Sequence, residues 1–192
     1  MLLHVNTTPT FIEAHPLIIN VACSIVGSLI FLFIVLIFLK PKIRISPFVC
    51  KSPSPFPTEQ AEIAYYIKVV NMSLFTAYDL KAELHILERY ATPPKGMMNV
   101  RQVPLTLVAG NLSNLDGYRP FWWRKEAEHC IRFRTLDNLD DILKADTKSV
   151  EFKVILRHGL TGLSKVYSQE YADLTEIKVG KFSYGTKFGL LN

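Results

Sequence analysis

Cysteine is scarce in this chain of 192 residues. The three cysteines, Cys23, Cys50 and Cys130, lie far apart in the sequence. A disulfide framework needs an even set of cysteines at regular spacings, and a structural zinc site needs closely spaced ligand pairs. The sequence therefore predicts neither of these, and reduced thiols fit a cytoplasmic location.

Motifs that mark catalytic and cofactor sites are also missing. No G-x-S-x-G elbow, Walker loop or G-x-G-x-x-G fingerprint occurs, and the five histidines show no H-E-x-x-H spacing. The stretch RHGLTGLSK has the glycines and basic residues of a phosphate loop, but a hairpin turn between Arg157 and Leu163 accounts for it. We expect no enzyme, no cofactor and no small-molecule substrate. A metal site assembled across strands and a membrane-tethered enzyme are the remaining alternatives.

Basic residues are absent from the first 39 positions. Within them, residues 17–39 form an uncharged run, LIINVACSIVGSLIFLFIVLIFL. As a helix this run would be about 34 Å long, enough to cross a hydrocarbon core of about 30 Å. A buried soluble helix seldom stays uncharged on every face, and a signal peptide has a basic n-region and a shorter apolar run. The sequence predicts a retained transmembrane helix at 17–39.

The distribution of positive charge predicts the orientation of this span. All 22 Lys and Arg residues follow Leu39, and cytoplasmic segments next to a membrane span carry the Lys/Arg excess. We therefore expect a single-pass cell-membrane protein. Residues 1–16 would be a short extracytoplasmic tail, and the rest would face the cytoplasm.

Residues 40–60 form a basic, proline-rich juxtamembrane segment. Its basic residues are Lys40, Lys42, Arg44 and Lys51. Basic side chains at this position can bind anionic membrane lipids, each contributing about 1 kcal/mol. The rule that places positive charge on the inner side explains the same cluster without lipid recognition. No Lys/Arg run is dense enough to follow a phosphate backbone, so we expect no nucleic-acid partner.

Residues 61–192 read as a succession of strands. In residues 76–88, Tyr78, Leu80, Ala82, Leu84 and Ile86 alternate with polar residues, which is the period of a strand with one buried face. Similar short segments follow at 100–108, 128–136, 149–160, 162–171 and 180–191. Seven or eight such strands joined by turn residues predict a mainly β protein, an immunoglobulin-like β-sandwich.

One short helix is expected after the span, at 137–146 (DNLDDILKAD). Its three acidic residues within five positions could suggest acid catalysis, but no partner pocket is visible in the sequence. Capping by Asp137 or Asn138, with Asp140 and Asp141 in the first turn, explains these residues as features of a helix N-terminus.

Two stretches resemble the cytoplasmic domain of inward-rectifier potassium channels. YIKVVNMSLFTAYDLKAELHIL resembles the paired strands that open that domain, and VEFKVILRHGLTGLSKVYSQEYADLTEIKVGKFSYGTKF resembles its later hairpin and closing strand. The resemblance covers about residues 61–190 and implies an immunoglobulin-like fold beneath a membrane. The chain has one span and nothing like the filter sequence TVGYG, so a channel activity does not follow.

The most unusual patch is YRPFWWRK at 118–125. Its aromatic residues are Tyr118, Phe121, Trp122 and Trp123. Such a group can cap the core of a sandwich, contact a protein partner or lie at a membrane interface. We expect a non-catalytic, membrane-anchored binding or assembly module that has a protein partner or self-associates. The alternative is an accessory or regulatory subunit of a channel or transporter.

Overall fold

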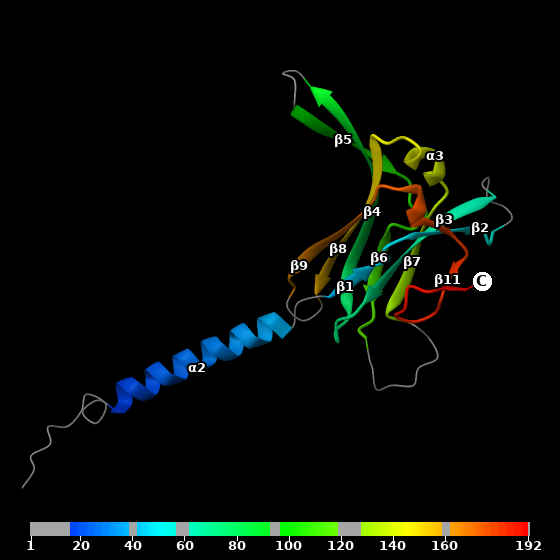
Figure 1. The fold of residues 1–192 in the computed structure, drawn as a ribbon. Helices are drawn as coiled ribbons and strands as arrows, with labels where there is room; N and C mark the ends of the chain where they lie inside the picture. Colours follow the sequence, from blue (N-terminus) through cyan, green and yellow to red (C-terminus); the bar gives the residue numbers. More distant parts are fainter. Residues whose placement is uncertain are drawn as a thin grey trace, which may run out of the picture. The chain divides into compact units, whose positions relative to one another are not determined.

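The computed structural model divides the chain into two units, Met1–Leu39 and Lys40–Asn192. The residues that the structure describes are 16–38, 42–56, 62–92, 97–118, 128–158 and 162–191. The chain is mainly β, with one long apolar helix near its N-terminus (Figure 1).

The first unit contains the helix α2 (Pro16–Phe38). Proline suits the first helical position because its missing N–H would have no intrahelical partner there. Residues Leu17–Leu36 of this helix are long and apolar enough to cross a membrane. The helix agrees with the predicted segment 17–39 to within one residue at each end.

The second unit contains two five-stranded sheets and a small two-stranded one. Sheet A consists of β1 (Ile43–Ile45), β2 (Val49–Pro53), β3 (Ile63–Asn71), β7 (Cys130–Thr135) and β10 (Ile177–Val179). Sheet B consists of β4 (Ala77–Thr92), β5 (Met97–Leu105), β6 (Asn111–Leu115), β8 (Lys148–His158) and β9 (Ser164–Tyr171). The C-terminal hairpin pairs β11 (Lys181–Phe182) with β12 (Leu190–Leu191). A helix α3 (Leu139–Leu143) and a 3₁₀ turn η1 (Leu174–Glu176) complete the unit.

One hydrophobic core joins the two larger sheets. Phe133 of sheet A and Phe152 of sheet B are both buried, with their ring centroids 5.5 Å apart. On β8 the expected alternation is confirmed, because Phe152, Val154 and Leu156 are buried while Arg157 is exposed. The period of two in the sequence therefore determines which residues of β8 form the core.

A β-bulge interrupts the expected alternation at the start of β4. The pairing of β4 with β8 shifts between Tyr78 and Lys81, and Asp79 between them has φ +49°. The extra residue reverses which side chains face inward. As a result Ala77 is buried and Tyr78 is exposed, whereas Leu80, Ala82 and Leu84 lie in the core as predicted. Ile86, also predicted to face inward, is half-buried. The prediction that Tyr78 lies on the buried face was wrong.

The β domain begins earlier than the expected residue 61. Strands β1 and β2 both belong to sheet A, although 40–60 was expected to be a juxtamembrane connector. Within this segment, the stretch KIRISPFVC (42–50) alternates basic and apolar residues through Ile43 and Ile45, which is a short strand signal. β2 contains Ser52 and Pro53, residue types that are uncommon inside strands, and Pro53 occupies its last position.

Helix α3 confirms the expected role of the acidic stretch. Asn138 is the N-cap, and its side-chain oxygen accepts a hydrogen bond from the backbone N–H of Asp141. Asp140 and Asp141 lie in the first turn, where the positive end of the helix dipole favours them. The helix is one turn long and covers the core with Leu139 and Leu143, both buried.

Candidate functional site

The outer face of sheet A, the face turned away from the main core, carries a row of basic side chains. The inward-facing residues of its strands, such as Val49, Ile67 and Phe133, belong to the core shared with sheet B. Their neighbours in the sequence must point the other way. The outward-facing residues include Arg44, Cys50, Tyr66, Lys68, Arg132, Arg134 and Lys178.

The C-terminal hairpin covers part of this face. Phe182 of β11 is buried and stacks on Phe48, with the ring centroids 5.4 Å apart. Lys68 is also buried, and its ammonium group donates hydrogen bonds to the carbonyl oxygens of Ser183 (2.7 Å) and Lys187 (2.8 Å). These contacts fix the hairpin on the sheet.

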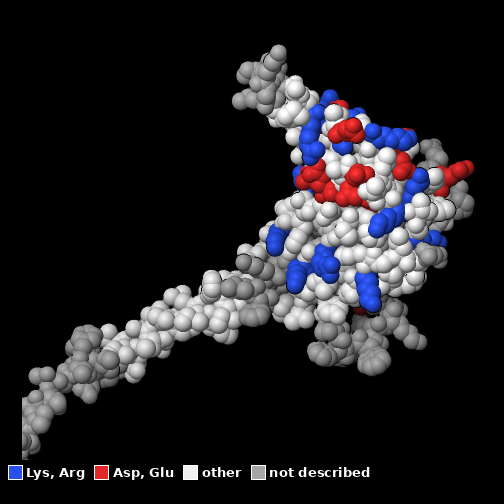
Figure 2. Space-filling view, viewed as in Figure 1, with Lys and Arg blue, Asp and Glu red and all other residues white. Residues whose placement is uncertain are grey.

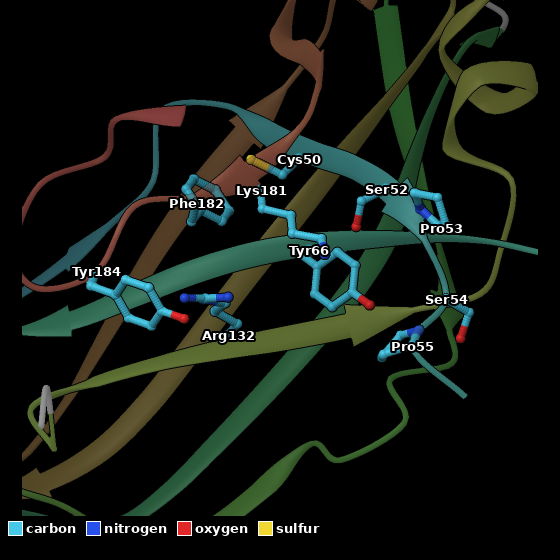
Figure 3. A pocket seen from close by; sticks show the side chains of 10 residues that line it. All are labelled: Cys50, Ser52, Pro53, Ser54, Pro55, Tyr66, Arg132, Lys181, Phe182 and Tyr184. Atoms are coloured by element: carbon cyan, nitrogen blue, oxygen red, sulfur yellow. The ribbon is translucent and has the colours of Figure 1, made fainter. Parts of the chain in front are cut away.

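A cleft of about 410 Å³ lies between the outer face of sheet A and the hairpin (Figure 3). The lining residues are Cys50, Ser52, Pro53, Ser54, Pro55, Tyr66, Arg132, Lys181, Phe182 and Tyr184. Figure 3 shows the guanidinium group of Arg132 next to the ring of Tyr184, and the guanidinium carbon lies 5.5 Å from the ring centroid. The cleft thus combines aromatic and proline walls with two cationic side chains.

Positive charge on this face is paired with aromatic rings. Besides the Arg132–Tyr184 pair, Arg44 lies over Phe188, Arg134 over Phe56 and Lys178 over Phe48, at 5.2, 4.8 and 4.4 Å. An aromatic face attracts a cation but does not neutralise it. Within the described part of the chain, neither Arg132 nor Lys181 forms an ion pair.

The outer face of sheet B differs, because its charges form pairs of opposite sign. Glu83 pairs with Lys81 at 2.7 Å, and Glu151 pairs with Lys153 at 2.9 Å. On the face drawn in Figure 2, acidic side chains lie in the upper half of the β domain among Lys and Arg, and the charged side chains of the lower half are mainly Lys and Arg. The cleft therefore differs from the charged surface of sheet B, because its cations have no ion-pair partner in the described part of the chain.

The buried thiol in the cleft is unsuited to nucleophilic catalysis. Burial raises the pKa of Cys50 to about 12, although the nearby cations Arg132, Lys178 and Lys68 act in the opposite direction. A cysteine reacts as its thiolate, and a raised pKa keeps the thiol protonated at neutral pH. Cys50 therefore contributes an apolar wall to the cleft.

A second polar cluster surrounds the N-terminus of α3, and its side chains form hydrogen bonds and an ion pair with one another. Asp140 forms an ion pair with Lys51 and accepts a hydrogen bond from the Tyr65 hydroxyl at 2.7 Å. Burial favours the protonated acid, but the hydrogen bonds from Lys51 and Tyr65 outweigh it, so the pKa of Asp140 is below its usual value. This carboxylate stays ionised at neutral pH and serves to hold α3 against sheet A.

Of the four basic residues expected to bind lipid, the structure describes three, and Arg44 and Lys51 point to different sides of sheet A. Lys40 lies outside the described residues, and Lys42 is exposed just before β1. Arg44 points to the outer face of sheet A, where it contacts Phe188. Lys51 points to the opposite side, where it contacts Asp140 and the ring of Tyr65. Because Lys51 has an acidic partner within the domain, it is less suited to lipid binding than Lys42 or Arg44.

Of the aromatic patch, the structure describes only Tyr118. It is half-buried, and its ring meets that of His129 edge-on, with the centroids 5.4 Å apart. Its backbone N–H donates to the carbonyl of Ser73 at 2.7 Å. Phe121, Trp122 and Trp123 lie outside the described residues, so their role as a partner contact stays a prediction.

A two-stranded arm is the other surface that could bind a partner. We define the arm as residues 89–92 of β4 and 97–100 of β5, because the pairing of β4 with β8 ends at Glu88. Figure 1 shows the two strands extending beyond the rest of the β domain. Met98 and Val100 of the arm are 63% and 52% exposed. Within the described residues, no further strand pairs with the outer edge of β5.

The sequence contained only part of the signal for the cleft. The alternation in CIRFRT placed Arg132 and Arg134 on one face, but nothing in the sequence paired that face with the C-terminal hairpin, and Lys181 and Tyr184 were missed. Among the described residues, no group of three or more His, Cys, Asp or Glu side chains could hold a metal ion. No protein-family model and no curated protein matches the sequence.

Proposed function

We propose that the chain is a membrane-anchored binding and assembly module without catalytic activity. Its apolar helix would cross the cell membrane once, and its β domain would be an immunoglobulin-like sandwich. Two five-stranded sheets that share one core support the sandwich. The resemblance to inward-rectifier cytoplasmic domains supports the immunoglobulin-like type.

The charge distribution supports a cytoplasmic β domain. All 22 Lys and Arg residues lie at position 40 or later in the sequence. Translocated short tails avoid basic residues, whereas cytoplasmic segments retain them. Only four residues separate Phe38, the last residue of α2, from Ile43 in β1. So short a tether would keep the domain close to the leaflet and raise its effective concentration for membrane-associated partners. Lys42 and Arg44 would then contact anionic lipids.

The exposed arm is the observation that carries the assembly function. A two-stranded ribbon is at best marginally stable in water, and an unpaired strand edge can pair with another chain. Val100 lies opposite Arg89, and Met98 lies opposite Ala91. Directly opposed residues share a face of a sheet, so Met98, Val100 and Ala91 lie on one face of the arm. Arg89 lies on the same face and pairs with Glu170. This face, and the edge of β5 with which no strand among the described residues pairs, are suited to a protein partner or a second copy of the chain.

Photo-crosslinking in intact membranes tests this function. We expect a benzoylphenylalanine at position 100 to form an adduct, and one at position 179 to form none. Val179 is a matched control because it is also a strand valine and is 80% exposed. An adduct of twice the chain mass would show self-association, and another mass would show a different partner. Uncrosslinked monomer at both positions would contradict an assembly role for the arm.

A second candidate is an accessory or regulatory subunit of a channel or transporter. Small residues recur in α2, with Cys23 and Gly27 four positions apart and Ser24 and Ser28 likewise. Small residues at this spacing allow close packing between membrane helices. Deletion of the chain should then change ion or solute flux, and substitution of Gly27 by Leu should have the same effect. Unchanged flux after deletion would remove this candidate.

A further inference from the structure

We infer that the cleft beside the C-terminal hairpin binds a small organic anion, a single planar ring that carries a carboxylate or phosphate group. This site lies on sheet A and is independent of the arm, so it extends the proposed function without resting on it. The inference depends on the charge, shape and rigidity of the cleft.

The charge of the cleft favours an oxyanion. Among the residues that the structure describes, Arg132 and Lys181 lie on its wall without an acidic ion-pair partner, and none of the lining residues is acidic. Lys68 and Lys178 add positive potential nearby, since both act on the thiol of Cys50. A guanidinium group binds carboxylate and phosphate oxygens through paired N–H donors. The hydroxyl groups of Tyr66 and Tyr184 can supply further donors.

The shape of the cleft favours a ring. At about 410 Å³ it is near the lower end of the range for small-molecule sites, about 300–1,000 Å³. The accessible part of its apolar wall consists of Tyr66 and two prolines, Pro53 and Pro55, and the buried Cys50 and Phe182 complete it. Aromatic rings stack with planar groups, and prolines present a rigid apolar surface. A ligand without a ring would leave this wall uncovered.

Hydrogen bonds within the protein hold the walls of the cleft in place. Lys68 holds the carbonyl groups of Ser183 and Lys187, which flank the position of Tyr184 in the sequence. The Sγ of Cys130 donates to the carbonyl of Gly185 at 3.2 Å, which adds a second anchor to the turn. Tyr184 in turn lies against Arg132. A preformed site binds with a smaller loss of conformational entropy than one that must order on binding.

Calorimetric titration of the full chain in phosphatidylcholine nanodiscs tests the inference. The probes are phenyl phosphate, benzoate, phenol and inorganic phosphate. We expect saturable binding of phenyl phosphate or benzoate that is about tenfold tighter than binding of phenol or inorganic phosphate. The reason is that phenol lacks the anionic group and inorganic phosphate lacks the ring. The tighter of the two ring anions identifies the oxyanion as phosphate or carboxylate.

Variants show whether binding occurs in the cleft. Arg132→Gln and Lys181→Gln should each weaken the tighter probe by about tenfold, as expected for loss of a charge-assisted hydrogen bond. Lys178→Gln is the matched control, because it removes the same charge from the same face but does not line the cleft. It should change the affinity less than threefold. Thermal unfolding of each variant confirms that the domain is folded.

Three results would overturn the inference. The first is no saturable binding of either ring anion to the folded protein. The second is equal weakening by Lys178→Gln and Arg132→Gln, which would indicate a general positive field. The third is binding of a glutamate-rich peptide when neither ring anion binds, which would assign the cleft to an acidic protein segment.

Discussion

His158 shows how burial of one titratable side chain makes stability depend on pH. It lies at the end of β8, is fully buried and meets the ring of Phe75 edge-on at 5.4 Å. Burial lowers its pKa from the usual 6.5, because the imidazolium ion loses its hydration. For His129, burial and then the charge of Lys68 lower the pKa in the same way. Both rings are therefore held neutral by the fold.

Acidification from about pH 7.5 to about pH 5.5 should lower the free energy of unfolding. The unfolded chain takes up protons on these histidines near pH 6.5, and the folded chain does so only at lower pH. The unfolded state thus binds more protons in this window, so the stability present above pH 6.5 is lost as the pH falls. His158→Phe should reduce this loss, as measured by thermal unfolding at both pH values. An unchanged loss in the variant would contradict the role of His158.

The C-terminal hairpin depends on a hydrogen-bonded lysine more than on its own strands. Its strands have only two residues each, and a pair this short is not stable alone. Burial lowers the pKa of Lys68, so holding its charge in the protein costs free energy. The two carbonyl groups that accept its hydrogen bonds offset this cost and connect sheet A to the hairpin.

Replacing Lys68 with Met should therefore loosen the hairpin. The variant leaves two carbonyl groups without their donor, and we expect the free energy of unfolding to fall by about 1–3 kcal/mol. The thiol of Cys50 should also react faster with a maleimide reagent, because the hairpin residue Phe182 packs in the same cluster. Lys178→Met is the control, since Lys178 is exposed on the same face. Equal labelling of Cys50 in the two variants would show that Lys68 does not anchor the hairpin.

Local sequence patterns predicted the individual helices and strands better than they predicted which strands pair with one another. The alternation in β8 identified its buried face, and the acidic stretch at 137–141 identified the N-terminus of α3. The pattern failed at Tyr78, because a bulge at Asp79 is set by pairing with β8 and not by the local sequence. β2 was missed because Ser52 and Pro53 are poor strand formers that sheet A nevertheless holds in place.

The cleft could not be predicted for the same reason. Arg132 and Lys181 are 49 positions apart in the sequence, and each alone resembles an ordinary solvated charge. They line one cleft because Lys68, far from both in the sequence, binds the backbone of the hairpin. Such a long-range hydrogen bond has no local signature. The expected lipid contacts Lys40, Lys42, Arg44 and Lys51 all stay predictions, and Lys51 also pairs with Asp140.

At the scale of the whole molecule, the distribution of charge leads to a prediction about membrane topology. Basic residues close to a membrane span favour the inner side. We therefore expect the tail without Lys or Arg to be translocated, and the segment with Lys40, Lys42, Arg44 and Lys51 to stay on the inner side. Two single-cysteine substitutions report on the two ends of the chain. Thr8→Cys lies in the tail that precedes α2, and Val179→Cys lies on β10, where the side chain is 80% exposed.

In intact cells, a membrane-impermeant maleimide should label Thr8→Cys and leave Val179→Cys unlabelled. Permeabilising the membrane should then expose Val179→Cys to the reagent, which controls for steric protection by the fold. Cys23→Ala and Cys130→Ala remove the exposed and the half-buried thiols from the background, and Cys50 is buried. Labelling of Val179→Cys before permeabilisation would show the opposite orientation, in which the basic surface of sheet A faces the outside of the cell.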